Sequence, residues 1–109
     1  MYAIYKYKLA VSDSQYVTLP LAAKIISVAL QGTDICLWAI VNTNETKTEQ
    51  VVIEVYGTGH PFPHPYAGMT IGVTRRDFIG TVVAGKFVWH IFQVVDPTKD
   101  PTKLQLGNG

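Results

Sequence analysis

The sequence is poor in the residues that mark disulfide-bonded, metal-binding or nucleic-acid-binding proteins. Its single cysteine, Cys36, excludes an internal disulfide framework and a zinc site built from several thiolates. Charged residues make up only 16% of the chain, and a net charge of +1 gives no strong field to attract duplex nucleic acid or an anionic membrane. No apolar run is long enough for a signal peptide or a membrane span. We therefore predict a cytoplasmic protein that binds neither duplex nucleic acid nor membranes.

The sequence has enough apolar residues for one hydrophobic core. A chain of 109 residues, of which 48% are hydrophobic, has the usual size of a single domain. The last residues repeat the tetrapeptide Asp-Pro-Thr-Lys and end in Gly-Asn-Gly, so they lack the apolar content to fold alone. We predict one β domain over residues 1–95 and a polar tail over residues 96–109.

Short apolar runs, rich in β-branched and aromatic residues and bounded by turn formers, predict strands rather than helices. The runs are residues 2–9, 15–20, 23–30, 35–41, 50–57, 76–85 and 86–95. We expect hairpins between the first two runs, across the polar loop 42–49, and across Ala84-Gly85. The pattern predicts an all-β fold of about seven short antiparallel strands in a small sandwich or open barrel, with no major helix.

The stretch YGTGHPFPHPY, residues 56–66, is the most constrained loop of the chain. Its glycines could let backbone N–H groups approach an anion such as a phosphate. Alternatively, the glycines and prolines only shape a wide turn, and Phe62 and Tyr66 plug one end of the core. Both interpretations fit the sequence.

Residues near this loop could complete a pocket for a small anionic, nucleotide-like ligand. Arg75 or Arg76 would neutralise charge, and an aromatic ring would stack on a base. The alternative for Arg76 is an ion pair with a nearby acid. The candidate ligand-binding residues are Tyr56, Gly57, Thr58, Gly59, His60, Arg75, Arg76 and Trp89.

No combination of residues predicts catalysis or a metal. His60, His64, His90 and Cys36 could supply ligands, but the intervening prolines prevent the helix on which a His-x3-His pair binds zinc. Cys36 lies in an apolar run typical of an inert core cysteine, and no motif joins a nucleophile to a base. We expect no enzymatic activity, no cofactor and no bound metal.

Four segments resemble a family of short, uncharacterised proteins encoded largely by bacteriophages and prophages. They are Leu37-Trp38-Ala39, Tyr56-Gly57-Thr58-Gly59-His60-Pro61, Phe78-Ile79-Gly80-Thr81 and Val88-Trp89-His90-Ile91-Phe92, within a likeness over residues 4–93. Usual members of that family end soon after the last strand, so the repeated tail is a departure. The resemblance implies a phage accessory protein acting in the host cytoplasm.

Two main hypotheses follow, and a third is weaker. The first is a binding protein that sequesters a nucleotide-derived immune signal and thereby counters host defence. The second is an interaction module that blocks a host protein or forms a homo-oligomer through exposed aromatic strands, which the low surface charge favours. The third is a minor structural role in the virion.

Overall fold

The computed structural model describes residues 1–62, 70–71 and 74–96, and within them the fold is entirely β. These residues contain no helix, and therefore none that could cross a membrane. The prediction of an all-β protein is confirmed. The strands are β1 (Tyr2–Leu9), β2 (Ser14–Pro20), β3 (Lys24–Gln31), β4 (Asp34–Asn42), β5 (Thr48–Gly57), the two-residue β6 (Thr70–Ile71), β7 (Thr74–Ala84) and β8 (Phe87–Val95).

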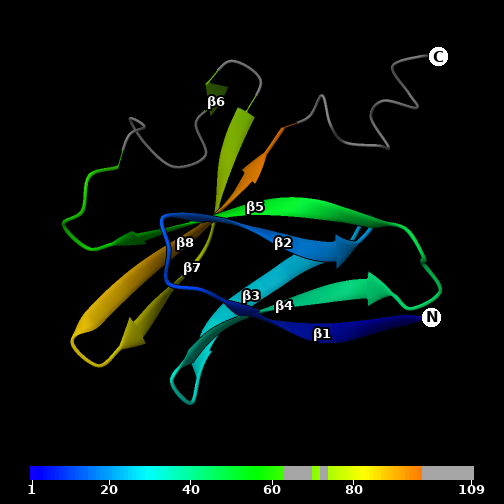
Figure 1. Ribbon diagram of the computed structural model, residues 1–109, viewed down its shortest axis with the longest axis horizontal. Helices are drawn as coiled ribbons and strands as arrows, with labels where there is room; N and C mark the ends of the chain where they lie inside the picture. Colours follow the sequence, from blue (N-terminus) through cyan, green and yellow to red (C-terminus); the bar gives the residue numbers. More distant parts are fainter. Residues whose placement is uncertain (63–69, 72–73, 97–109) are drawn as a thin grey trace.

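The strands form two antiparallel sheets that face each other and do not close into a barrel (Figure 1). The smaller sheet has the order β1-β4-β3, and the larger has the order β2-β5-β8-β7-β6. Of the two predicted architectures, the sandwich is therefore the observed one.

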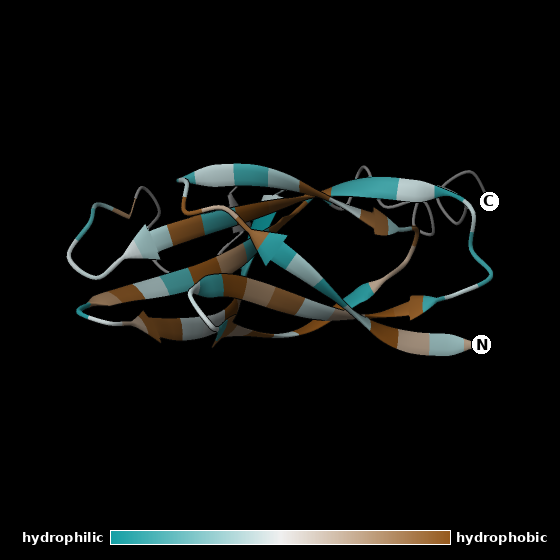
Figure 2. Cartoon of the chain, turned by 60° about the horizontal axis from the view of Figure 1, so that its bottom comes forward, coloured by the Kyte–Doolittle hydropathy of each residue, from teal (hydrophilic) through white to brown (hydrophobic). Residues whose placement is uncertain are grey.

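The core lies between the sheets and follows the alternation of the strands. In β5, Val51, Ile53 and Val55 point inward and are buried, as predicted, while Glu54 and Tyr56 lie on the outer face. Leu37 of β4 and other core residues are fully excluded from water, and no described polar or charged residue is buried. Figure 2 shows hydrophobic segments along the strands of both layers, with mostly polar connections at the two ends. Burial of these alternating side chains holds the layers together.

Two of the three expected hairpins are wrong. β1 pairs with β4 and β2 with β5, so the chain crosses between layers after β1, after β2 and again after β4. Gln15 stabilises the first crossing, because its side-chain amide accepts from Ala10 N at 2.9 Å and donates to Ala10 O at 2.7 Å. Alternation reveals which face of a strand is apolar but not which strand lies beside it, so sequence adjacency was a poor guide. Only the expected hairpin across Ala84-Gly85 is confirmed, with Gly85 at φ 63°.

The two layers approach closely where β3 crosses β7. A bulge between Phe78 and Gly80 bends β7, and a Cβ added to Gly80 would lie 2.9 Å from Val28 Cγ1 on β3. Glycine at this position therefore permits the contact that fixes β7, and with it the β7–β8 hairpin, against the smaller sheet.

Candidate functional site

The turn after β5 packs against the start of β8. Gly57 pairs with Trp89, the amide of Thr58 donates to the carbonyl of Val88 at 3.1 Å, and the amide of His60 donates to the carbonyl of Gly57 at 3.0 Å. Gly59 adopts a φ of 86°, which only glycine takes readily, so this residue closes the turn. In Figure 1 the turn and the β7–β8 hairpin lie at the same end of the sandwich, on the left.

The hydrogen bonds of the turn correct one part of the predicted site. The amides of Thr58 and His60 were expected to face outward and bind an anion, but both already donate to carbonyls of the protein. A satisfied amide gains little by exchanging its partner for a ligand. Thr58 and His60 are exposed, so this turn presents their side chains to solvent rather than their amides.

Three aromatic rings meet at this end and form what we call the aromatic shelf: His60, Phe87 and Trp89. Phe87 and Trp89 stack with centroids 5.8 Å apart and planes inclined by 20°, and the His60 ring meets Trp89 edge-on at 6.3 Å. Phe87 keeps 54% of its surface exposed. The Lys86 ammonium lies 5.6 Å from the Phe87 centroid, so a cation accompanies the shelf.

Gly57 has no side chain, which leaves room for the His60 ring to pack against Trp89. A Cβ at position 57 would lie 2.7 Å from the His60 ring and 3.2 Å from the Trp89 ring. The imidazole therefore occupies the volume that any other residue at this position would fill. This explains the first glycine of the Gly-Thr-Gly turn better than an anion-binding amide does.

A chain of two hydroxyls and an imidazole lies on the opposite face of β8 from the shelf, because His90 directly follows Trp89 in the strand. His90 Nε2 is 2.7 Å from Thr58 Oγ1, and His90 Nδ1 is 3.0 Å from Thr81 Oγ1. A neutral imidazole has one donor and one acceptor nitrogen, so one threonine donates to the ring and the other accepts from it. Each hydroxyl keeps hydrogen-bonding capacity beyond its contact with the ring.

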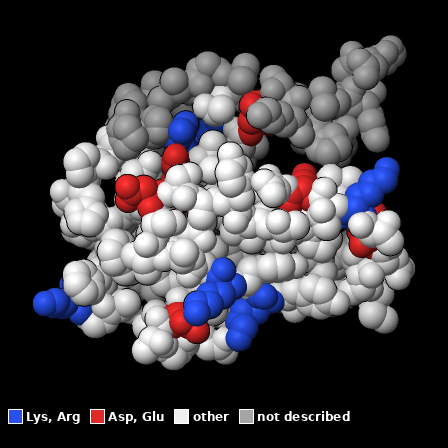
Figure 3. Space-filling model, in the orientation of Figure 1, with Lys and Arg blue, Asp and Glu red and all other residues white. Residues whose placement is uncertain are grey.

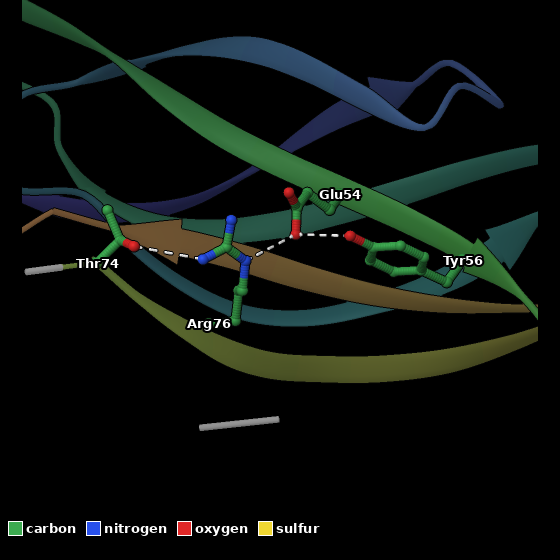
Figure 4. A network of polar contacts seen from close by, with 4 residues as sticks. All are labelled: Glu54, Tyr56, Thr74 and Arg76. Atoms are coloured by element: carbon green, nitrogen blue, oxygen red, sulfur yellow. Dashed lines mark hydrogen bonds and ion pairs between the residues drawn. The ribbon is translucent and has the colours of Figure 1, made fainter. Parts of the chain in front are cut away.

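Arg76 is committed to a separate network on the outer face of the larger sheet (Figure 4). Its Nε lies 3.2 Å from Glu54 Oε1, and its guanidinium also donates to Thr74 Oγ1 at 3.3 Å. The Arg76 and Glu54 side chains retain only 14% and 13% of their exposure. The alternative prediction was that Arg76 pairs with a nearby acid on the surface; the pairing is confirmed, but both side chains are largely buried.

Tyr56 belongs to the same network. Its hydroxyl donates to Glu54 Oε1 at 3.0 Å, and its ring meets Phe62 and Phe92 edge-on at 4.7 and 5.8 Å. Burial, followed by the bond to the Glu54 carboxylate, raises the pKa of Tyr56 to about 12. The prediction that this ring stacks on a ligand is corrected, because other rings already pack against it.

Arg75 also lies apart from the turn. Its guanidinium binds Asp77 through two hydrogen bonds of 2.7 and 3.0 Å, which raise the pKa of Arg75. Arg75 and Arg76 pair with Val95 and Val94, near the end of β8 that is remote from Trp89. At roughly 3.3 Å per residue, the arginine pair lies on the order of 16 Å along the strand from the shelf. Of the eight predicted residues, the structure thus brings together Gly57, Thr58, Gly59, His60 and Trp89.

The sequence reasoning missed Lys86, Phe87 and Thr81 as parts of this end. Lys86 and Phe87 follow the tight turn at Gly85, and Phe87 shares a strand face with Trp89 because the two are two residues apart. These were readable signals once the β7–β8 hairpin was expected. Thr81 could be found in the same way, since the regular register from Ala84 opposite Phe87 places Thr81 opposite His90, before the bulge in β7.

The remaining candidates form no metal centre in the described part of the chain. Cys36 is buried in β4, and no three His, Cys, Asp or Glu side chains of residues 1–62, 70–71 and 74–96 gather at one point. His64 and Tyr66 lie outside the described residues. Figure 3 shows small, separate groups of basic and acidic side chains on a largely uncharged face. A ligand for this surface would be recognised by few charges and by stacking.

Comparison with known proteins assigns the family. A family model described as Domain of unknown function (DUF7352) matches residues 1–102, and the chain belongs to that family. The match includes the whole β domain and continues past β8. No curated protein and no solved structure matches the chain.

Proposed function

We propose that this member of the DUF7352 family binds a small anionic, nucleotide-like ligand at the aromatic shelf and releases it unchanged. One observation carries the proposal: an exposed aromatic stack and a lysine lie together at one end of the sandwich. Planar rings offer a stacking surface for a base at little cost in conformational entropy. No chemistry on the ligand is needed for such binding.

Each group has a separate role. The base stacks on Phe87 and Trp89, and the Lys86 ammonium, which swings on a flexible stem, neutralises a phosphate. The Thr58 hydroxyl is bonded to His90 on the opposite face of β8, so it has no assigned contact with a ligand on the shelf. This assignment replaces Arg75, Arg76 and Tyr56, whose polar groups are engaged elsewhere.

The resemblance to phage-encoded proteins supports a use for such binding. A small non-enzymatic protein that holds a nucleotide-derived signal in the host cytoplasm lowers its free concentration and so blunts the immune response that the signal triggers. Sequestration requires that the ligand be held tightly but not altered. This separates the proposal from an enzymatic role.

Native mass spectrometry and thermal shift test the proposal directly. The full chain, isolated from infected cells, should release a small molecule of unchanged mass on denaturation. In vitro, at least one probe among cyclic mononucleotides, cyclic dinucleotides and ADP-ribose should raise Tm, since a ligand at a hundred times its Kd stabilises by about 2.7 kcal/mol. If no probe shifts Tm and no small molecule is released, the proposal is wrong, and a chemically modified nucleotide would indicate an enzyme.

Matched variants locate the site. Phe87→Ala should weaken binding at least tenfold, because the stacking ring is lost, at roughly 1–3 kcal/mol per stacked base. Phe78→Ala is the control, because Phe78 is 55% exposed, against 54% for Phe87, and lies on the same sheet but far from the turn. Equal losses in the two variants would place the ligand elsewhere.

Gly57→Ala tests the position of the imidazole. The added methyl overlaps the His60 ring, which is exposed and can swing outward, so we expect a stability change below about 1 kcal/mol. Displacing His60 should nevertheless lower the affinity for the same probe several-fold, as measured by titration calorimetry. Unchanged affinity would show that His60 does not contact the ligand.

A further inference from the structure

We propose that two copies of this chain associate through the free edge of β1, antiparallel across a two-fold axis, so that the smaller sheet continues from one copy into the other. The proposal goes beyond ligand binding, because it concerns the other sheet. Among the described residues, β1 pairs only with β4, over eight consecutive residues from Tyr2 to Leu9. Its second edge therefore presents unpaired backbone N–H and C=O groups.

This edge strand exposes apolar side chains on both of its faces. Tyr2 and Ile4, on the outer face, keep 71% and 59% of their surfaces exposed, and Tyr5, on the inner face, keeps 47%. An exposed strand edge flanked by hydrophobic side chains favours pairing with another chain. The rest of the sandwich therefore covers β1 only in part.

The other described sheet edges are better protected. β3 contains a bulge between Ile25 and Ser27, which interrupts a regular ladder. β2 ends at Pro20, β6 has only two residues, and the part of β7 that β6 does not pair with contains the bulge between Phe78 and Gly80. β1 has no proline, glycine or bulge along its length. It is therefore the edge most suited to a second copy.

Lysines on an edge strand usually discourage pairing with another chain, but the lysine side chains of β1 extend over their own sheet. Lys6 Nζ donates to Gln31 Oε1 of β3, on the far side of β4, and Lys8 Nζ lies 3.4 Å from Asp34 Oδ1 of β4. Both ammonium groups are thus drawn away from the free edge. The two ammonium groups that would repel a second strand therefore do not lie at the free edge of β1.

The sequence of β1 complements itself in the antiparallel direction. Its first half, Tyr2–Tyr5, is uncharged, and both lysines lie in its second half. If the two copies meet with Tyr5 opposite Tyr5, Lys6 faces Ile4 of the second copy and Lys8 faces Tyr2 of the second copy. The aliphatic stem of each lysine then packs on an uncharged side chain, while the ammonium groups keep their contacts with Gln31 and Asp34. A parallel arrangement would instead align like charges, which is unfavourable.

Sedimentation velocity on the full chain tests the inference, with concentrations up to about 100 µM covering the micromolar affinities typical of small interfaces. We expect a concentration-dependent species of twice the 12.0 kDa chain mass. A folded wild-type chain that stays monomeric over this range would overturn the proposal.

Charge substitutions identify the edge. Tyr2→Lys and Ile4→Lys, each placing a lysine opposite a lysine of the second copy, should weaken the dimer at least tenfold. Tyr16→Lys is the control, because Tyr16 on β2 is 71% exposed, the same as Tyr2. Thermal melts confirm that the variants fold, and Tyr2→Lys remains informative if Ile4→Lys does not fold. A dimer that survives both β1 substitutions, or that Tyr16→Lys weakens equally, refutes pairing through β1.

Discussion

Two adjacent arginines should differ sharply in their contribution to stability. Arg76→Met removes the cation from Glu54, whose side chain keeps 13% exposure and, among the described residues, would retain the Tyr56 hydroxyl as its partner. Arg75→Met removes an ion pair with Asp77 in which both side chains keep more than 40% exposure. The methionine stem preserves most of the packing in each case, so the comparison isolates the charge.

The expected magnitudes follow from this difference in burial. Leaving one member of a buried pair without its partner costs about 3–5 kcal/mol, and the residual exposure of Glu54 lowers our expectation to about 2 kcal/mol. An exposed pair contributes at most about 0.5 kcal/mol here. Because 1 kcal/mol shifts Tm by roughly 4–8 °C in a domain of this size, Arg76→Met should lower Tm by about 8–16 °C and Arg75→Met by less than about 4 °C.

Thermal denaturation followed by circular dichroism at neutral pH measures both variants. The double variant Glu54→Gln/Arg76→Met should recover at least about 1 kcal/mol relative to Arg76→Met, because it removes the stranded carboxylate. Equal losses in the two arginine variants, or no recovery in the double variant, would refute the assignment of Arg76 to a structural network.

Two further predictions concern packing and pH. Gly80→Ala places a Cβ 2.9 Å from Val28 Cγ1, so it should lower the free energy of unfolding in urea by about 1–3 kcal/mol, and an unchanged value would contradict the close approach of β3 and β7. The pKa of Tyr56 is about 12 in the folded protein, against 10.0 for the free side chain. Above pH 10 the unfolded state therefore loses its phenolic proton first. The stability that the protonated hydroxyl contributes is lost as the pH rises toward 12. Comparing the alkaline unfolding of the wild type with that of Tyr56→Phe, and following tyrosinate absorbance, isolates this contribution; identical pH profiles would contradict it.

Side-chain alternation explains why the strands and their faces could be predicted. Val51, Ile53 and Val55 recur with the period of a strand, so their burial follows from local geometry. Cys36 lies in a run that is apolar on both faces, and the structure buries it in β4, the central strand of the smaller sheet. Such inferences need no knowledge of strand partners.

Strand partners, and with them most of the predicted site, depend on contacts between distant residues. The partner of Arg76 is Glu54, 22 residues away, and neither residue indicates the other in the sequence. The opposite orientation of Arg75 and Arg76 was easier to predict from the sequence. Consecutive residues of a strand point to opposite faces, so two adjacent arginines of one strand cannot both face one ligand. The predicted strand began at residue 76 and left Arg75 outside it, whereas β7 begins at Thr74 and includes both arginines.

The ligand site and the dimer edge lie on different sheets, which makes the two proposals independent. The shelf residue Trp89 belongs to β8 and pairs with Gly57 of β5, whereas Tyr2 belongs to β1 and pairs with β4. A two-fold axis perpendicular to β1 at its free edge would leave the shelf of each copy formed by one chain alone, and a dimer would carry two equivalent sites. Tyr2→Lys should therefore separate the copies without changing the affinity of either site, and Phe87→Ala should weaken binding without separating the copies. A loss of binding in Tyr2→Lys would mean that the second copy contributes to the site, which the described residues of a single chain give no reason to expect.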